Sequence, residues 1–155
     1  GLSYVGLGLG TIAASSFGHA ISQRFGPGPT MVLGFATCGL GWTLPALAPA
    51  GPLGVAAFAA MLLLTGAGAV LVFINFLGLR QAVTPAPLLG RMTSTMRWLI
   101  LLPAVPGALL GGWIGEAFSL QATLGAAGIG ALLLAAISWH APVIRAVRSL
   151  PPPAD

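Results

Sequence analysis

The chain has 155 residues, of which 57% are hydrophobic and only 5% are charged. A soluble domain has roughly a quarter of its residues charged. Six arginines and two acids therefore exclude a soluble globular protein and predict a single all-α membrane domain over residues 1–155. The net charge of +4 does not indicate nucleic-acid binding, because every positive charge is an arginine in a short link or in the tail, where topology-setting charges lie.

Five segments are long and apolar enough to cross a bilayer, which takes about 20 residues of helix. They cover 2–21, 30–47, 53–76, 98–117 and 120–139. A Gly-Pro breaker at 26–29 and a Pro/Gly-rich link at 48–52 separate the first three. The sequence starts at Gly1 without a methionine or a basic leader, so we expect a fragment of a longer protein.

The arginines predict the orientation of these spans. They fall in the links after the first and third spans and in the basic, Pro-rich tail at 142–155: Arg24, Arg80, Arg91, Arg97, Arg145 and Arg148. Hydrocarbon does not solvate a guanidinium, so the segment 77–98, which holds three arginines, is expected in water at a membrane face. The positive-inside rule makes that face and the tail cytoplasmic and the start of the chain external, as an odd number of spans also requires.

Small residues recur every fourth position on two spans, which predicts close helix contacts in lipid. One set is Gly6, Gly10, Ala14 and Gly18, and the other is Gly107, Gly111 and Gly115. We also expect bends, at Pro103 and Pro106 in the fourth span and at Gly66 and Gly68 in the third. Tryptophans lie near span ends, as an aromatic belt at the headgroups would: Trp42, Trp98, Trp113 and Trp139.

Weakly polar residues inside the spans are the candidates for a substrate path. Thr11 and Ser15 share one face of the first span, while Thr65 and Asn75 lie on the third. Their hydroxyls either line a water-filled path or bond to carbonyls of their own helix, and the latter is favoured for any single one. No catalytic set, metal-ligand spacing or cofactor motif is present, so we expect neither an enzyme nor a metal site.

The third link carries the most recognisable residues in the chain. They are Asn75, Leu79-Arg80-Gln81, Val83-Thr84-Pro85, Leu88-Leu89-Gly90-Arg91-Met92, Ser94 and Arg97. This run resembles the loop between the tenth and eleventh helices of major facilitator superfamily exporters, in the branch of enterobactin exporters and macrolide efflux pumps. The residues at 106–112 and 121–124 are similar to the eleventh helix and the start of the twelfth.

The resemblance implies that the five spans are helices eight to twelve of a twelve-helix transporter in a bacterial inner membrane. It implies proton-driven export of a small hydrophobic compound or siderophore by alternating access. The missing first part of the same chain would then be a partner. Arg24, Arg80, Arg91 and Arg97 would orient the chain and contribute to the inner gate, with anionic lipid headgroups as the alternative partner.

The link after the first span departs from the family pattern. The family usually has an acid and several arginines here, whereas residues 22–28 keep Arg24, Phe25 and Gly26 and have Gln23 in place of the acid. A charge-relay latch is therefore not expected, and no ionisable residue mid-span offers a proton carrier. The alternative function is a non-transporting membrane subunit that packs on a partner through the glycines of the fourth span.

Overall fold

The computed structural model describes the backbone of residues 3–147, and every regular element in that range is helical. The side chains of residues 3, 4 and 145 lie outside the description. The elements are α1 Ser3–Phe25, α2 Pro27–Leu47, α3 Pro52–Val83, the short 3-10 helix η1 Ala86–Leu88, α4 Leu89–Leu101, α5 Ala104–Ala117, α6 Leu120–His140 and α7 Pro142–Ala146.

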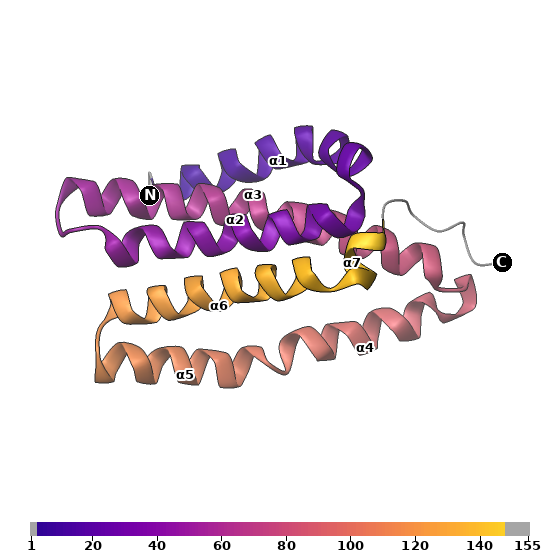
Figure 1. Cartoon of the computed structure of the whole chain (residues 1–155). Coiled ribbons are helices and arrows are strands. Elements are labelled where there is room, and N and C mark those ends of the chain that lie inside the picture. Colours follow the sequence, from indigo (N-terminus) through magenta and orange to yellow (C-terminus); the bar gives the residue numbers. More distant parts are fainter. Residues whose placement is uncertain (1–2, 148–155) are drawn as a thin grey trace.

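The long helices form one bundle in which successive spans run in opposite directions (Figure 1). Their packing order differs from their order in the chain: α1 packs on α3, α3 on α2, α2 on α6 and α6 on α5. The α1–α2 and α3–α4 links and α7 gather at one end, here called the arginine end (Figure 1). The α2–α3 and α5–α6 links lie at the opposite end, as the alternation of arginines predicts.

Prolines determine where the helices begin and end. Pro27 and Pro52 occupy first turns, where a missing N–H removes no helical hydrogen bond, and each follows a glycine with positive φ, Gly26 at 88° and Gly51 at 113°. Conversely, α2, α3 and α6 end at residues that directly precede a proline and adopt extended backbone angles. The predicted breaker at 26–29 is thus one residue long, because its second member already starts α2.

The arginine-bearing segment 77–98 is helical rather than the loop expected from its polarity. α3 runs on to Val83 and carries Arg80, and α4 begins at Leu89 and carries Arg91 and Arg97. The 32 residues of α3 extend about 48 Å, well beyond a hydrocarbon core of about 30 Å. The helices therefore continue into the aqueous layer, and the chain turns only between Thr84 and Leu88.

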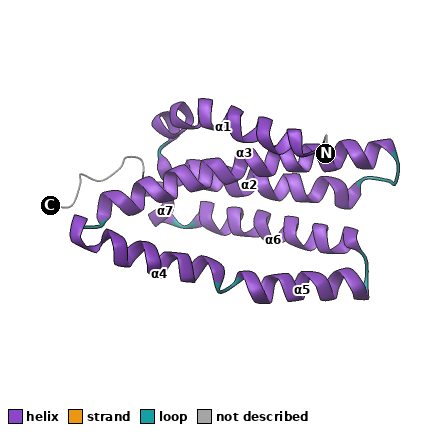
Figure 2. Ribbon diagram, turned by 180° about the vertical axis from the view of Figure 1, so that it is seen from behind, coloured by secondary structure: helices purple, strands orange, loops and turns teal. Residues whose placement is uncertain are grey.

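The expected interruption of the fourth span is present at Pro103 but not at Pro106, which lies in the first turn of α5, and the expected bend of the third span is absent. α4 and α5 are separate helices joined at Leu102 and Pro103, in one rod that runs along the outer edge of the bundle beside α6 (Figure 2). A proline lacks an N–H and its ring clashes with the preceding turn, which accounts for this break. α3 is continuous through Gly66 and Gly68, so these glycines do not bend it.

Four segments of the described chain are long and apolar enough to cross a membrane: Pro27–Leu47, Pro52–Val83, Ala86–Ala117 and Leu120–His140. The fold is therefore that of a multi-pass helical membrane protein. α1 has 23 residues but is not among the four, because its glycines, serines and His19 lower its hydropathy. A fifth crossing by α1 stays a prediction.

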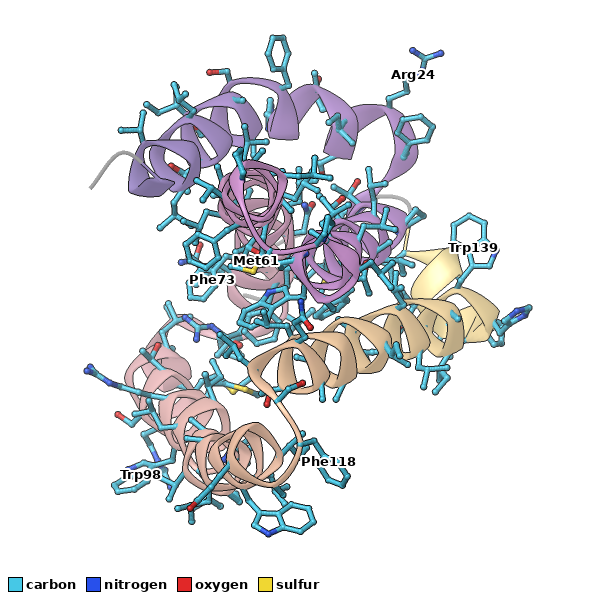
Figure 3. The ribbon with its side chains drawn as sticks, turned by 90° about the vertical axis from the view of Figure 1, so that its left-hand side faces the viewer. Arg24, Met61, Phe73, Trp98, Phe118 and Trp139 are labelled. Atoms are coloured by element: carbon cyan, nitrogen blue, oxygen red, sulfur yellow. The ribbon has the colours of Figure 1, made fainter. Side chains whose placement is uncertain are left out.

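Glycines, rather than large side chains, bring the helices together. The buried apolar residues are few and mostly of modest size: Ala14, Val32, Met61, Leu71 and Ala135. Met61 is buried on α3 whereas Phe73 of the same helix is 61% exposed, as a lipid-facing residue would be (Figure 3). α2 crosses α3 where Gly34 meets Gly68 and crosses α6 where Gly39 meets Gly128. Close approach of backbones replaces hydrophobic burial as the packing force in lipid.

Candidate functional site

The predicted gate arginines are placed at the arginine end by α1, α3 and α4. Arg24, Arg91 and Arg97 are exposed, and the Arg24 guanidinium lies 5.7 Å from the centre of the Phe25 ring. Arg80 is partly buried, and its Nε has no hydrogen-bond partner among the described residues. The described acid, Glu116, lies near the opposite end of the rod, so none of these guanidinium groups has a described carboxylate beside it.

The two hydroxyls proposed on α1 bond to their own helix. Thr11 Oγ1 donates to the Gly8 carbonyl over 2.8 Å, and Ser15 Oγ donates to the Ile12 carbonyl over 2.9 Å. Each donor is thereby satisfied without a second helix. Ser15 remains exposed, and the Thr11 methyl lies 3.3 Å from the Cβ position of Gly66. Thr11 is therefore at the α1–α3 contact.

Thr65 lies in α3 where this helix meets α2. Its hydroxyl is buried and has no hydrogen-bond partner among the described residues. Its carbonyl accepts a weak hydrogen bond of 3.7 Å from the Cys38 thiol. The Cβ position of Gly41 is 3.5 Å from the Thr65 Oγ1. Thr65 thus faces a helix crossing rather than Thr11 and Ser15, and the two pairs of proposed path residues do not form one continuous stripe.

Asn75 forms the main polar link between α1 and α3. It is 4% exposed, and its Nδ2 donates to the Leu71 carbonyl over 2.7 Å. Its Oδ1 accepts a hydrogen bond of 2.5 Å from the Ser22 hydroxyl. Sequence reasoning missed Ser22, although this residue continues the four-residue repeat of Gly6, Gly10, Ala14 and Gly18. The repeat could have identified it as a contact residue.

Replacing Asn75 with alanine is expected to destabilise the bundle by about 1 kcal/mol, because interhelical hydrogen bonds in membranes contribute amounts of this order. Unfolding in mixed detergent micelles measures the effect. In a double-mutant cycle, Ser22→Ala should add little to Asn75→Ala, since both remove the same bond. Ser16→Ala is the matched control, because the Ser16 hydroxyl bonds only to Ile12 of its own helix. Fully additive effects of the Asn75 and Ser22 changes would contradict the link.

The two predicted small-residue seams differ in their surroundings. On α1, the Cβ positions of Gly6 and Gly10 meet the carbonyl oxygens of Ala59 and Leu63, so the seam lies against α3. On α5, only Gly111 and Gly115 approach a neighbour, Thr123 of α6, at 3.6 and 3.2 Å. The Thr123 hydroxyl also donates to the Gly111 carbonyl over 3.2 Å.

Gly107 makes no close contact within the described chain, because no described atom of another helix lies within 4 Å of its Cβ position, and its predicted helix contact stays a prediction. The break at Leu102 and Pro103 lies one turn before this glycine, and no residue of α5 is buried among the described residues. The α5 contact with α6 is thus confined to the end of the helix that is distant from the break.

Two hollows lie among the described residues at the surfaces of α4 and α2, and neither is lined by a proposed path residue. An open hollow of about 250 Å³ on α4 is lined by Ser94, Arg97, Trp98 and Leu101. A second, apolar one of about 160 Å³ lies at the arginine end and is lined by Gly28, Met31, Val32, Phe35, Leu79, Ser138, Ile144 and Val147. The four path candidates therefore line neither of these two hollows.

The first residues of the predicted cytoplasmic tail form the short helix α7. α7 turns back onto α2, and the Gly28 N–H donates to the Val147 carbonyl over 3.1 Å. A Cβ on Gly28 would meet the Ile144 carbonyl oxygen, so glycine permits this close approach. Residues 148–155, including Arg148, lie outside the described residues.

Comparison with family models, with curated proteins and with solved structures gave no match for this chain.

Proposed function

We propose that the chain is the C-terminal portion of a major facilitator exporter, with α1, α2, α3, the α4–α5 rod and α6 as its helices eight to twelve. The observation that carries this proposal is the residue run from Asn75 to Arg97, which resembles the loop between the tenth and eleventh helices of that family. The bundle is compatible with it, because the run joins two spans at the end where the arginines gather.

The proposed role is proton-driven export of a small hydrophobic compound or siderophore from the bacterial cytoplasm across the inner membrane. Alternating access of this kind works by rocking one helix bundle against another around a substrate held near the midplane. α1 and the α4–α5 rod lie on the outer sides of the bundle (Figure 1). In that family the corresponding helices abut the other half of the molecule. The N-terminal half of the proposed transporter could therefore pack on α1 and on the α4–α5 rod.

The described residues contribute apolar and weakly polar surface to the proposed substrate path. Asn75 is a buried polar residue of α3, and the Thr65 hydroxyl on the same helix is buried and has no hydrogen-bond partner among the described residues. No ionisable side chain lies mid-span in the sequence. The proposal therefore assigns the proton-carrying acid to helices that precede this sequence.

An accumulation assay tests the proposed export. Cells that express the complete gene should retain less of a labelled hydrophobic drug or siderophore than cells without it, and an uncoupler that collapses the proton gradient should abolish the difference. The uncoupler should abolish the difference in retention because export against a concentration gradient needs the gradient of the coupling ion. Equal retention in both strains across both compound classes would contradict the proposal.

The second candidate is a membrane subunit that packs on a partner through α5. The open Cβ position of Gly107 favours it, because an uncovered glycine on a helix lets another backbone approach closely. The coding sequence that precedes Gly1 separates the candidates. Seven further spans followed by this segment support the exporter, whereas a start codon near Gly1 supports the subunit.

A further inference from the structure

The open hollow on α4 has the composition of a lipid headgroup site. Its lining residues, Ser94, Arg97, Trp98 and Leu101, are spaced three, four and seven apart and so share one face of the helix. Trp98 is 72% exposed, and Figure 3 shows it on the side of α4 turned away from α6. Because α4 has no buried side chain among the described residues, none of them covers this face.

Along this face the residues become less polar from the turn at 84–88 toward the break before α5. Ser94 lies nearest the turn at 84–88, Arg97 follows one turn later, and Leu101 lies next to the break before α5. Ser94 and Leu101 are about 10 Å apart along the helix axis, comparable with the step from a lipid phosphate to the upper acyl chain. Trp98 lies between them, and indole rings prefer this interfacial level.

The Arg97 guanidinium has no described anion near it. Glu116, the acid of the described residues, is 19 positions further along the α4–α5 rod, or about 30 Å away. A guanidinium carries a fork of donors that matches the oxygens of a phosphate. The Ser94 hydroxyl donates to the Gly90 carbonyl over 3.2 Å, which is long for a hydroxyl donor and is easily exchanged for a better acceptor.

We infer that this face binds the phosphate of an anionic phospholipid in the leaflet at the arginine end. Arg97 is the principal anion-binding group, Ser94 is a second donor, and Trp98 and Leu101 contact the glycerol and the upper acyl chain. Arg91, exposed two turns before Arg97, adds positive charge on the aqueous side. The inference requires that the α4–α5 rod crosses a membrane and that lipid, and not another part of the protein, covers this face of α4; it does not depend on transport.

Quenching of Trp98 by brominated lipids tests the site in the full chain. Trp42, Trp113 and Trp139 are replaced with phenylalanine, which leaves Trp98 as the fluorophore, and the protein is placed in phosphatidylcholine vesicles. At the same mole fraction, brominated phosphatidylglycerol should quench Trp98 more strongly than brominated phosphatidylcholine, by an amount that corresponds to an about fivefold higher occupancy next to Trp98. One arginine near anionic lipid contributes a binding preference of this size. Arg97→Gln should remove the preference, and Arg97→Lys should retain part of it.

Arg24→Gln is the matched control, because Arg24 is equally exposed at the same end but lies on α1. It should leave the preference unchanged, and circular dichroism should show the same helix content in every variant. Equal quenching by the two lipids, a preference that survives Arg97→Gln, or an equal loss in Arg24→Gln would overturn the inference. Weak quenching by both lipids would overturn it too, by showing that protein covers the face. If inorganic phosphate removes the preference but sodium chloride of the same ionic strength does not, the site binds a free anion and not a lipid phosphate.

Discussion

Gly128→Ala should destabilise the bundle by about 2 kcal/mol, whereas Gly130→Ala, two residues along the same helix, should leave it unchanged or slightly more stable. A Cβ on Gly128 would lie 2.6 Å from the Thr43 methyl and 2.9 Å from the Thr43 nitrogen. The backbone of α2 must then move away from α6. A Cβ on Gly130 has no described atom within 4 Å, so it adds only helix propensity.

Unfolding of the purified chain in mixed detergent micelles measures both variants, and the two free energies should differ by about 2 to 3 kcal/mol. Gly10→Ala and Gly8→Ala form an independent pair on α1, because Gly10 meets the Leu63 carbonyl oxygen while Gly8 has open space. Equal effects within either pair would show that the described helix crossings are wrong. A destabilising Gly130→Ala alone would show that another chain covers that face.

The sequence was sufficient to predict the long apolar helices, their alternating direction and the break at Pro103, but not α4 or the last turns of α3. These features depend on local properties, namely apolar run length, proline chemistry and the side on which arginines lie. The end of α3 was also present in the sequence, because Thr84 precedes Pro85 and the residue before a proline avoids helical angles. Hydropathy alone places the end of the third span at residue 76, seven residues before the end of α3. Hydropathy marks the border of the hydrocarbon layer and not the last helical residue.

The helix crossings could not be predicted in the same way. Gly34 meets Gly68 and Gly39 meets Gly128, but none of these glycines belongs to a four-residue repeat with its neighbours. Which glycine meets which helix depends on the packing order, in which α2 lies between α3 and α6. A single sequence contains no information on that order. The same reason explains why the repeat at Gly107, Gly111 and Gly115 predicted a contact that the first of them does not make within the described chain.

The path candidates show the same limit. Asn75 was singled out because it is a weakly polar residue inside an apolar span, and the structure places it in a bond with Ser22 that joins α1 to α3. Thr65 was singled out for the same reason and has a buried, unsatisfied hydroxyl. Polarity in a span therefore identified residues with unusual surroundings, but whether they bond to a neighbouring helix depends on the packing order.

Labelling of single cysteines should place residue 86 on one side of the membrane and residues 50 and 118 on the other. Each of these positions is exposed, the first in the α3–α4 link and the others in links at the opposite end of the bundle. In a Cys38→Ala background, a membrane-impermeant maleimide should label Ala50→Cys and Phe118→Cys in intact cells. Ala86→Cys should react only after permeabilisation, because arginine-rich links remain cytoplasmic. Leu109→Cys, mid-way along α5, should react in neither case, since hydrocarbon suppresses the thiolate.

The same experiment decides whether α1 crosses the membrane. If it does, Val5→Cys near its start is labelled from outside, together with positions 50 and 118. If Val5→Cys reacts only after permeabilisation, α1 does not cross, the chain has four crossings instead of five, and the described packing of α1 along α3 is wrong. Labelling of positions 86 and 118 from the same side would be more damaging, because the α4–α5 rod could not then span the bilayer. The proposed exporter topology and the lipid site at Arg97 both require that rod to cross, with Arg97 and Glu116 about 30 Å apart on opposite faces.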